Sequence, residues 1–139
     1  SVIPFWKNLL KQGESLKLTS PKMNRLMFSK EASAKLIHDA YIHAENLSSP
    51  FILSNIMKTV NMLDLAKAMC DKDPIIVGLR PGEKLNETLV SKKELPYTKI
   101  EKDLVFIFKD IPFGSALKEE HSSLTAEKMT LTELKKLIE

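Results

Sequence analysis

Three side chains in two loops have the chemistry of an anion-binding site. Arg80 and Glu83 lie in LRPGE (79–83), directly after an apolar run, and Arg25 lies in SPKMNR (20–25). Only two of the 21 basic residues are arginines, and both lie in loops that contain a proline. A guanidinium group is a planar fork of donors that binds phosphate oxygens in two places. The two arginines predict a diphosphate site if folding brings them together; the alternative is that each pairs with a nearby carboxylate.

Several neighbouring side chains have two readings. Glu83 can accept hydrogen bonds from sugar hydroxyls, or it can be the negative charge at the start of a helical turn in GEKLNETL. Asn86 and Glu87 share this ambiguity. Trp6, beside Phe5, can form a flat apolar wall for a base or belong to the core. The sequence leaves these alternatives open.

Several common catalytic arrangements are missing from the sequence. The chain has only four glycines: Gly13, Gly78, Gly82 and Gly114. Their spacing excludes a dinucleotide-binding G-x-G-x-x-G turn and a P-loop. Tyr41 and Tyr97 are each followed four residues later by glutamate, so no Tyr-x-x-x-Lys dyad exists. No G-x-S-x-G elbow is present, and the three histidines and one cysteine lack metal-ligand spacing. We therefore expect no catalytic residue and no metal site in this chain.

The composition indicates one ordered domain without a strongly basic surface. The 139 residues are 43% hydrophobic and 28% charged, with a net charge of +3. Lysines and glutamates alternate along most of the chain, which disfavours nucleic acid as a partner. The single cysteine, Cys70, is typical of a reducing compartment, so we expect a cytoplasmic protein. No apolar run has membrane-spanning length, and SVIPFWKNLL lacks the basic leader and cleavage site of a signal peptide. Because the chain begins with Ser1, it can be a piece of a longer protein.

The elements that would position these loops follow from hydrophobic spacing and capping residues. We expect helices over 2–13, 30–46, 60–70 and 130–139, and strands over 16–19, 50–55, 74–79 and 103–108. Ser29 and Asn61 are predicted N-caps, and Thr130 forms a capping box with Glu133. Residues 20–28 are predicted to be a turn-like loop, and residues 109–129 an extended surface arm.

These elements predict an α/β or α+β domain of short strands and amphipathic helices. The longest helix should cover a neighbouring element with one face, formed by Ser33, Leu36, Ile37, Ala40, Tyr41 and Ala44. We divide the chain into a ligand-binding lobe, residues 1–108, and an extended C-terminal arm with a closing helix, residues 109–139.

Three stretches carry a resemblance to a known family. SVIPFWKNLLKQGESLKLTSPKMNRLMFSKEASAKLI, MLDLAKAM and IIVGLRPGEKLNETLVS occur in that order. They resemble the C-terminal part of nucleotide-sugar dehydratases, in particular the UDP-N-acetylglucosamine 4,6-dehydratase group of polysaccharide biosynthesis enzymes, which are extended short-chain dehydrogenases/reductases. The resemblance runs from Ser1 to about Phe108 and resumes in SLTAEKMTLTELKKLIE.

The resemblance implies roles for individual residues. Arg25 and Arg80 correspond to diphosphate contacts, and Glu83 to a ribose contact. The starting segment, with Val2, Ile3 and Pro4, would lie beside the uridine. The sequence departs from the family pattern at four positions: Ser20, Asn24, Leu26 and Asn86.

The resemblance also implies what this chain lacks. In such enzymes the NAD or NADP turn and the Tyr/Lys catalytic residues precede the point where this chain begins. The chain is then the substrate-binding half, without most of the Rossmann half, and is not expected to bind cofactor alone. We expect it to bind a UDP-sugar, specifically a UDP-N-acetylhexosamine, as the C-terminal part of a 4,6-dehydratase or epimerase. Its expected protein partner is a cofactor-binding lobe on another chain, or a second copy of itself in a homo-oligomer. The alternative is a non-catalytic binding or regulatory module that kept this lobe.

Overall fold

A computed structural model describes residues 2–110, 112 and 114–139. Its α-helices are α1 (Val2–Lys11), α2 (Lys30–Asn46), α3 (Met62–Met69) and α4 (Leu131–Ile138), with a 3₁₀ turn η1 at Leu95–Tyr97. The predicted caps are confirmed: Ser29 accepts a hydrogen bond from the Ala32 N–H, and Asn61 accepts from Leu63 and Asp64. Within the described residues, no helix has the length and apolar character needed to cross a membrane.

The strands form four small sheets in the described part of the chain. β1 (Lys17–Leu18) pairs in parallel with β5 (Ile75–Ile76), and β2 (Asn24–Met27) pairs antiparallel with β4 (Lys58–Asn61). β3 (Phe51–Asn55), β8 (Leu104–Phe108) and β7 (Thr98–Glu101) form an antiparallel sheet in the order β3-β8-β7. β6 (Thr88–Val90) pairs antiparallel with β9 (His121–Ser122). The predicted mixed α/β fold is confirmed.

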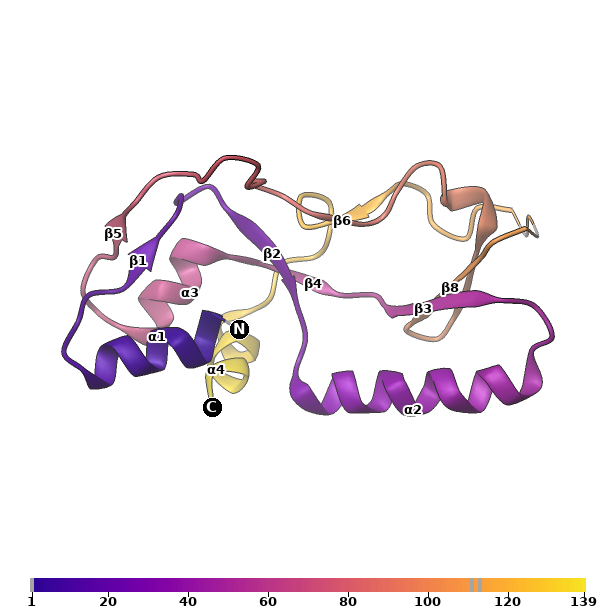
Figure 1. Ribbon diagram of the computed structural model, residues 1–139, viewed down its shortest axis with the longest axis horizontal. Coiled ribbons are helices and arrows are strands. Elements are labelled where there is room, and N and C mark those ends of the chain that lie inside the picture. The colour runs from indigo at the N-terminus through magenta and orange to yellow at the C-terminus, as the bar shows by residue number, and fades with distance from the viewer. Residues whose placement is uncertain (1, 111, 113) are drawn as a thin grey trace.

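The molecule is elongated, with helices gathered at its two ends (Figure 1). α1, α3 and α4 lie together near the β1–β5 pair, whereas α2 runs alongside β3 and β8 at the far end. The β2–β4 pair connects the two ends. This arrangement places β2 beside the end that contains α1, α3 and α4, where the candidate ligand residues also lie.

The main core fills the end formed by α1, α3 and α4. Trp6 and Leu9 are buried on the predicted apolar face of α1, and α3 contributes Leu65 and Ala66, both 0% exposed. Leu134 of α4 packs into the same cluster. Because these residues come from helices far apart in the sequence, their burial holds the two chain termini together.

The second core surrounds β8. Leu104, Phe106 and Phe108 pack with Phe51, Leu53 and Leu36 on the α2 side, whereas Val105 and Ile107 pack on the opposite face with Val90. All five residues of β8 are buried, because both faces of this strand are covered. The apolar run predicted to be a strand at 103–108 is thus confirmed.

Three expectations for the loops and surfaces are wrong. Residues 20–28 contain strand β2, which pairs with the unpredicted strand β4. Part of the predicted arm is folded into the molecule, since His121, Ser122 and Ser123 are buried and residues 121–122 form β9. The predicted packing face of α2 is only partly used: Ile37 is 71% exposed and Tyr41 is 63% exposed.

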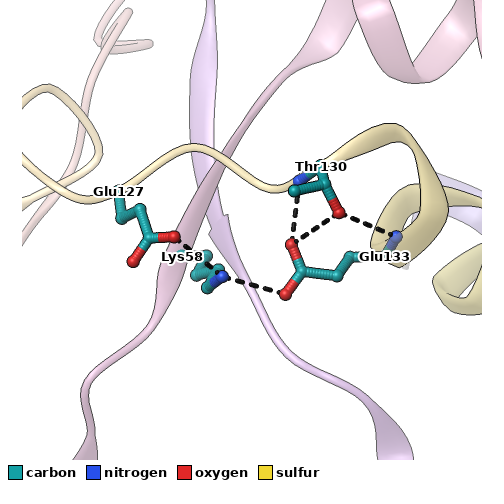
Figure 2. A network of polar contacts seen from close by, with 4 residues as sticks. All are labelled: Lys58, Glu127, Thr130 and Glu133. Atoms are coloured by element: carbon teal, nitrogen blue, oxygen red, sulfur yellow. Dashed lines mark hydrogen bonds and ion pairs between the residues drawn. The ribbon is translucent and has the colours of Figure 1, made fainter.

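A polar network ties the C-terminal segment to β4 (Figure 2). The Lys58 ammonium contacts Glu127 and Glu133, each at 2.9 Å. The predicted capping box is confirmed, since the Thr130 N–H donates to the Glu133 carboxylate and the Glu133 N–H donates to the Thr130 hydroxyl. The Thr130 backbone N–H, together with Lys58 and the Thr130 hydroxyl, lowers the pKa of Glu133 to about 2.

Loss of the Thr130 cap should destabilise the fold modestly. Thr130→Ala removes the acceptor for the Glu133 N–H at the start of α4, and we expect the free energy of unfolding to fall by about 1 kcal/mol. Urea unfolding measures this change. Thr130→Ser keeps the hydroxyl and should remain within about 0.5 kcal/mol of the parent chain. A serine variant as unstable as the alanine variant would contradict the capping role.

His121 of β9 forms a hydrogen bond with the bend between β3 and β4. The ring is 8% exposed, and its Nε2 accepts a hydrogen bond from the Met57 N–H at 3.2 Å. Burial lowers the pKa of His121 below its usual value of 6.5. A protonated ring would lose this acceptor lone pair, so the hydrogen bond from Met57 requires neutral His121.

This burial predicts a loss of stability in mild acid. The unfolded chain binds a proton at His121 near pH 6.5, but the folded chain binds it only at lower pH, so unfolding takes up a proton between the two pKa values. The contribution of neutral His121 to the free energy of unfolding is therefore complete above pH 6.5 and is lost as the pH falls below this value. Urea unfolding between pH 8 and pH 5 should show this decline, which His121→Gln should flatten. The exposed His38 is the matched control, and a decline that His38→Gln abolishes instead would overturn the assignment.

Candidate functional site

A cavity of about 530 Å³ lies where α1, β1, β2 and the segment after β5 meet. Its wall is mostly apolar and includes Val2, Ile3, Trp6, Leu18, Met23, Leu26, Met27, Phe28, Met62 and Leu137. Its polar side chains are Lys17, Thr19, Arg25, Glu83 and Glu87. A concave site with an apolar wall and a few polar groups is typical of small-molecule binding.

Arg25 is held in this cavity by backbone carbonyl groups. Its guanidinium group donates to the carbonyl oxygens of Asn24 at 2.8 Å, Lys84 at 2.9 Å and Leu85 at 3.2 Å. A guanidinium group has about five N–H donors, so these three bonds leave two for another acceptor. The bonds to Lys84 and Leu85 also join β2 to the segment that follows the RPGE turn. Arg25 is therefore oriented before any ligand arrives.

Glu83 is positioned by the turn that carries it. Its N–H donates to the Arg80 carbonyl at 3.0 Å, and its carboxylate accepts from the Arg80 N–H at 3.1 Å. Gly82 has a φ of +79°, a conformation that favours glycine. The same carboxylate accepts a long hydrogen bond from the Thr19 hydroxyl at 3.4 Å. The Pro-Gly turn thus holds a carboxylate against the cavity.

Asn24 of β2 and Asn86, which follows the RPGE turn, contact each other. The Asn24 amide donates to the Asn86 side-chain oxygen at 3.0 Å and accepts from the Asn61 amide at 3.2 Å. Beside them, the Glu87 carboxylate accepts from the Leu26 N–H at 2.7 Å. These bonds hold β2 against the segment that follows Glu83, so Asn86 and Glu87 have structural roles here.

The structure brings four of the six predicted site residues into one cavity: Val2, Ile3, Arg25 and Glu83. Pro4 is exposed in the first turn of α1, and neither Pro4 nor Arg80 is among the lining residues. Within the described residues the Arg80 guanidinium has no hydrogen-bond or ion-pair partner, and no ion pair holds Arg25 either. The cavity therefore contains one arginine rather than the expected two, and the alternative, in which each arginine pairs with a carboxylate, is not seen among the described residues either. A ligand contact by any of the six residues stays a prediction.

Three polar lining residues were not among the predicted site residues. Lys17 and Thr19 belong to the β1 segment, and Glu87 follows the RPGE turn. The alternating pattern at 16–19 indicated a strand but gave no sign of which face meets a cavity. Trp6 belongs to the core, since it is 2% exposed, and it also lines the cavity. A contact between Trp6 and a base stays a prediction.

The residues described in the structure contain no group of three His, Cys, Asp or Glu side chains placed to hold a metal ion. The polar groups of the cavity are a guanidinium, an ammonium, a hydroxyl and two carboxylates. This set can bind an anion and hydroxyl groups together.

Comparison with known proteins identifies relatives of this chain. Residues 1–109 match the family model described as "Polysaccharide biosynthesis protein". The chain is 32% identical over 155 residues to a UDP-glucose 4-epimerase of Rickettsia rickettsii (strain Sheila Smith), a match that covers 99% of this chain and 45% of the relative. It is 33% identical over 103 residues to the capsular polysaccharide biosynthesis protein CapD of Staphylococcus aureus, covering 68% of this chain and 17% of the relative.

A solved structure has the same fold. The X-ray structure of Pen from Bacillus thuringiensis superposes with a TM-score of 0.79 at 26% identity, covering 99% of this chain and 44% of that protein. The chain spans a little less than half the length of this protein and of the Rickettsia relative. Because the family model covers most of the sequence, the chain belongs to the polysaccharide biosynthesis protein family.

Proposed function

We propose that this chain is the UDP-sugar-binding lobe of a nicotinamide-dependent nucleotide-sugar epimerase or 4,6-dehydratase of surface polysaccharide biosynthesis. The observation that carries the proposal is the cavity that contains Arg25, Glu83, Val2 and Ile3 together. Relatives named UDP-glucose 4-epimerase and CapD support the reaction class. The epimerase names favour epimerisation, and a UDP-N-acetylhexosamine remains the proposed substrate.

The cavity residues suggest how the ligand is oriented. The two free donors of Arg25 would bind diphosphate oxygens, with the Lys17 ammonium adding positive charge. The Glu83 carboxylate would accept from ribose hydroxyls, and Val2, Ile3 and Trp6 would provide the apolar wall for the uracil ring. The sugar would then extend from the diphosphate towards the missing lobe.

This chain does not fit the nicotinamide cofactor by itself. No two of its four glycines have the spacing of the G-x-G-x-x-G turn, so they cannot form the glycine-rich turn that admits a pyrophosphate to a helix N-terminus. It also lacks a Tyr-x-x-x-Lys dyad. In the proposed assembly, NAD or NADP and the proton-transfer residues belong to a second lobe, and this chain binds and orients the nucleotide sugar.

Calorimetry with UDP tests the binding proposal. We expect UDP to bind and uridine to bind much more weakly, because uridine lacks the diphosphate that Arg25 would contact. UDP-N-acetylglucosamine and UDP-glucose then compare the two candidate substrates. Absence of UDP binding at millimolar concentration, in a chain shown to be folded by circular dichroism, would remove the proposal.

Arg80→Ala tests whether the second arginine reaches the ligand. The exposed guanidinium has no partner among the described residues, so its loss should leave the fold unchanged. We expect UDP affinity to fall about tenfold, near the lower limit for a charge-assisted hydrogen bond. Lys84→Ala removes a positive charge from the same loop and is the matched control. If both variants lowered the calorimetric UDP affinity equally and only slightly, Arg80 would act through its positive charge and not through a direct hydrogen bond to the ligand.

A second candidate is a binding or regulatory module without catalysis. The lining residues of the cavity include no tyrosine and no histidine, so they can bind a nucleotide sugar but do not supply a Tyr/Lys dyad, which favours this candidate. The two candidates differ when the chain is mixed with a cofactor-binding lobe from a relative. Formation of a 4-keto sugar or an epimerised product supports the catalytic assembly, whereas UDP binding without any turnover supports the module.

A further inference from the structure

The C-terminal segment is hydrogen-bonded to the segment that follows the RPGE turn. β9 pairs antiparallel with β6, and the two strands lie side by side (Figure 1). Ser123 continues this pairing by one residue. Its N–H donates to the Glu87 carbonyl at 2.8 Å, and its hydroxyl accepts from the Glu87 N–H at 3.0 Å. Ser123 is 1% exposed and does not line the cavity, but it binds both backbone groups of Glu87, which does.

Glu87 connects this contact to β2. Its carboxylate accepts from the Leu26 N–H of β2 at 2.7 Å. Leu26 lies opposite Thr59 of β4, and the Thr59 hydroxyl donates to the Ser123 carbonyl at 2.7 Å. The four residues therefore form a closed ring of contacts that joins β2, β4, the segment after the RPGE turn and the C-terminal segment. Thr59 and Ser123 are both buried, so water does not compete for these bonds.

The ring fixes the groups that orient Arg25. The carbonyl groups of Lys84 and Leu85, which hold the guanidinium, lie just before Glu87 in the same segment. Arg25 itself precedes Leu26 in β2. A shift between β2 and that segment would therefore turn the guanidinium away from its present direction. Charge-assisted hydrogen bonds depend on distance and angle, so such a shift would weaken a phosphate contact.

We propose that Ser123 is a positioning residue of the diphosphate site, acting through Glu87 on the direction of Arg25. This inference rests on the proposed function and adds to that site a residue outside the cavity. Ser123→Ala keeps the bond to the Glu87 carbonyl but removes the acceptor for the Glu87 N–H. We expect the UDP affinity to fall about fivefold, the effect of one hydrogen bond. The affinity for uridine, which lacks the diphosphate, should not change.

A double-mutant cycle tests the route through Arg25. If Ser123 acts on the guanidinium, Ser123→Ala should change UDP affinity by less than about twofold when Arg25 is already alanine. Calorimetry measures the four affinities. Ser122→Ala is the matched control, because Ser122 is 3% exposed in the same segment and its hydroxyl contacts Leu124 and Thr125 rather than Glu87. This control should leave UDP affinity unchanged.

A second variant enters the ring from the opposite side. Thr59→Val keeps the shape of the side chain but removes the hydroxyl that donates to the Ser123 carbonyl. It should lower UDP affinity about as much as Ser123→Ala does, and it decides the question if Ser123→Ala does not fold.

A measurement without ligand separates this inference from the proposed function. The chain has two arginines, so NMR of the guanidinium N–H groups gives two sets of signals, and Arg80→Lys identifies the set of Arg25. We expect these Arg25 protons to exchange slowly with solvent in the parent chain and in Ser122→Ala, and faster in Ser123→Ala and Thr59→Val.

The outcomes are distinct. Unchanged Arg25 exchange in both ring variants overturns the inference, and so does a loss of UDP affinity that is equal for uridine or persists when Arg25 is alanine. UDP binding by the parent chain leaves the proposed function standing in each of these cases. Faster Arg25 exchange in the ring variants of a chain that does not bind UDP supports the positioning by Ser123 and removes only the proposed function.

Discussion

Arg25→Ala should reduce the affinity for UDP by about 30- to 100-fold, the largest expected effect on ligand binding. The guanidinium is held by the carbonyl groups of Asn24, Lys84 and Leu85, so no ligand energy is needed to orient it. Its two remaining N–H donors would form charge-assisted bonds to phosphate oxygens. A loss of about 2–3 kcal/mol corresponds to one such arginine at a partly buried site. Calorimetry with UDP measures it directly.

The effect must be separated from loosening of the loop, because the same guanidinium joins β2 to residues 84–85. Uridine provides this separation: its affinity should change little if Arg25 acts on the diphosphate, but should fall in parallel with UDP if the cavity has lost its shape. Lys22→Ala is the charge control, because Lys22 is an exposed cation just before strand β2, which contains Arg25. Equal losses for uridine and UDP would assign Arg25 a structural role only.

Trp6→Ala should lower the free energy of unfolding by about 3–5 kcal/mol, the largest expected effect on stability. The indole is 2% exposed and packs in the main core with residues of α1, α3 and α4. Its removal leaves a cavity that the helices can only partly close. The loss is a large part of the stability of a typical domain, so the variant should unfold at much lower urea concentration.

The neighbouring residue Phe5 provides the control. Phe5 is 56% exposed on the same helix, so Phe5→Ala should change the free energy of unfolding by no more than about 0.5 kcal/mol. Trp6→Phe should recover much of the lost stability because it keeps an apolar ring. If the two alanine variants were equally stable, Trp6 would not be a core residue. Trp6 also lines the cavity. The UDP affinity of the folded Trp6→Phe variant therefore shows whether the indole contributes to binding.

Two hydrophobic cores account for the ordered fold of this chain. The main core and the β8 core are complete within this chain, since Leu65, Ala66 and Val105 are 0% exposed. Apolar side chains are exposed at several places outside these cores, among them β3, α2, the segment around β5, Phe5, Leu124 and Leu131. These side chains lie on the surface and leave no gap in either core.

The sequence alone determined the features that depend on residues close together along the chain. Ser29, Asn61 and Thr130 cap their helices as predicted, because an N-cap side chain bonds to N–H groups only two or three residues away. The apolar run 103–108 contains a strand as predicted, and this strand, residues 104–108, is buried because five large apolar residues are stable in a strand only when both faces are covered.

Tertiary structure decided the rest. The strands β2, β4 and β9 have weak local signals and exist because partners distant in the sequence supply their hydrogen bonds. Arg25 reaches the carbonyls of Lys84 and Leu85, contacts that no local spacing encodes, and Arg80 stays outside the cavity. On α2, spacing identified the apolar side chains, but only packing shows that Leu36 is covered while Ile37 remains open. Local bonds can be read from one stretch of chain, whereas burial depends on what another stretch, or another polypeptide, places against it.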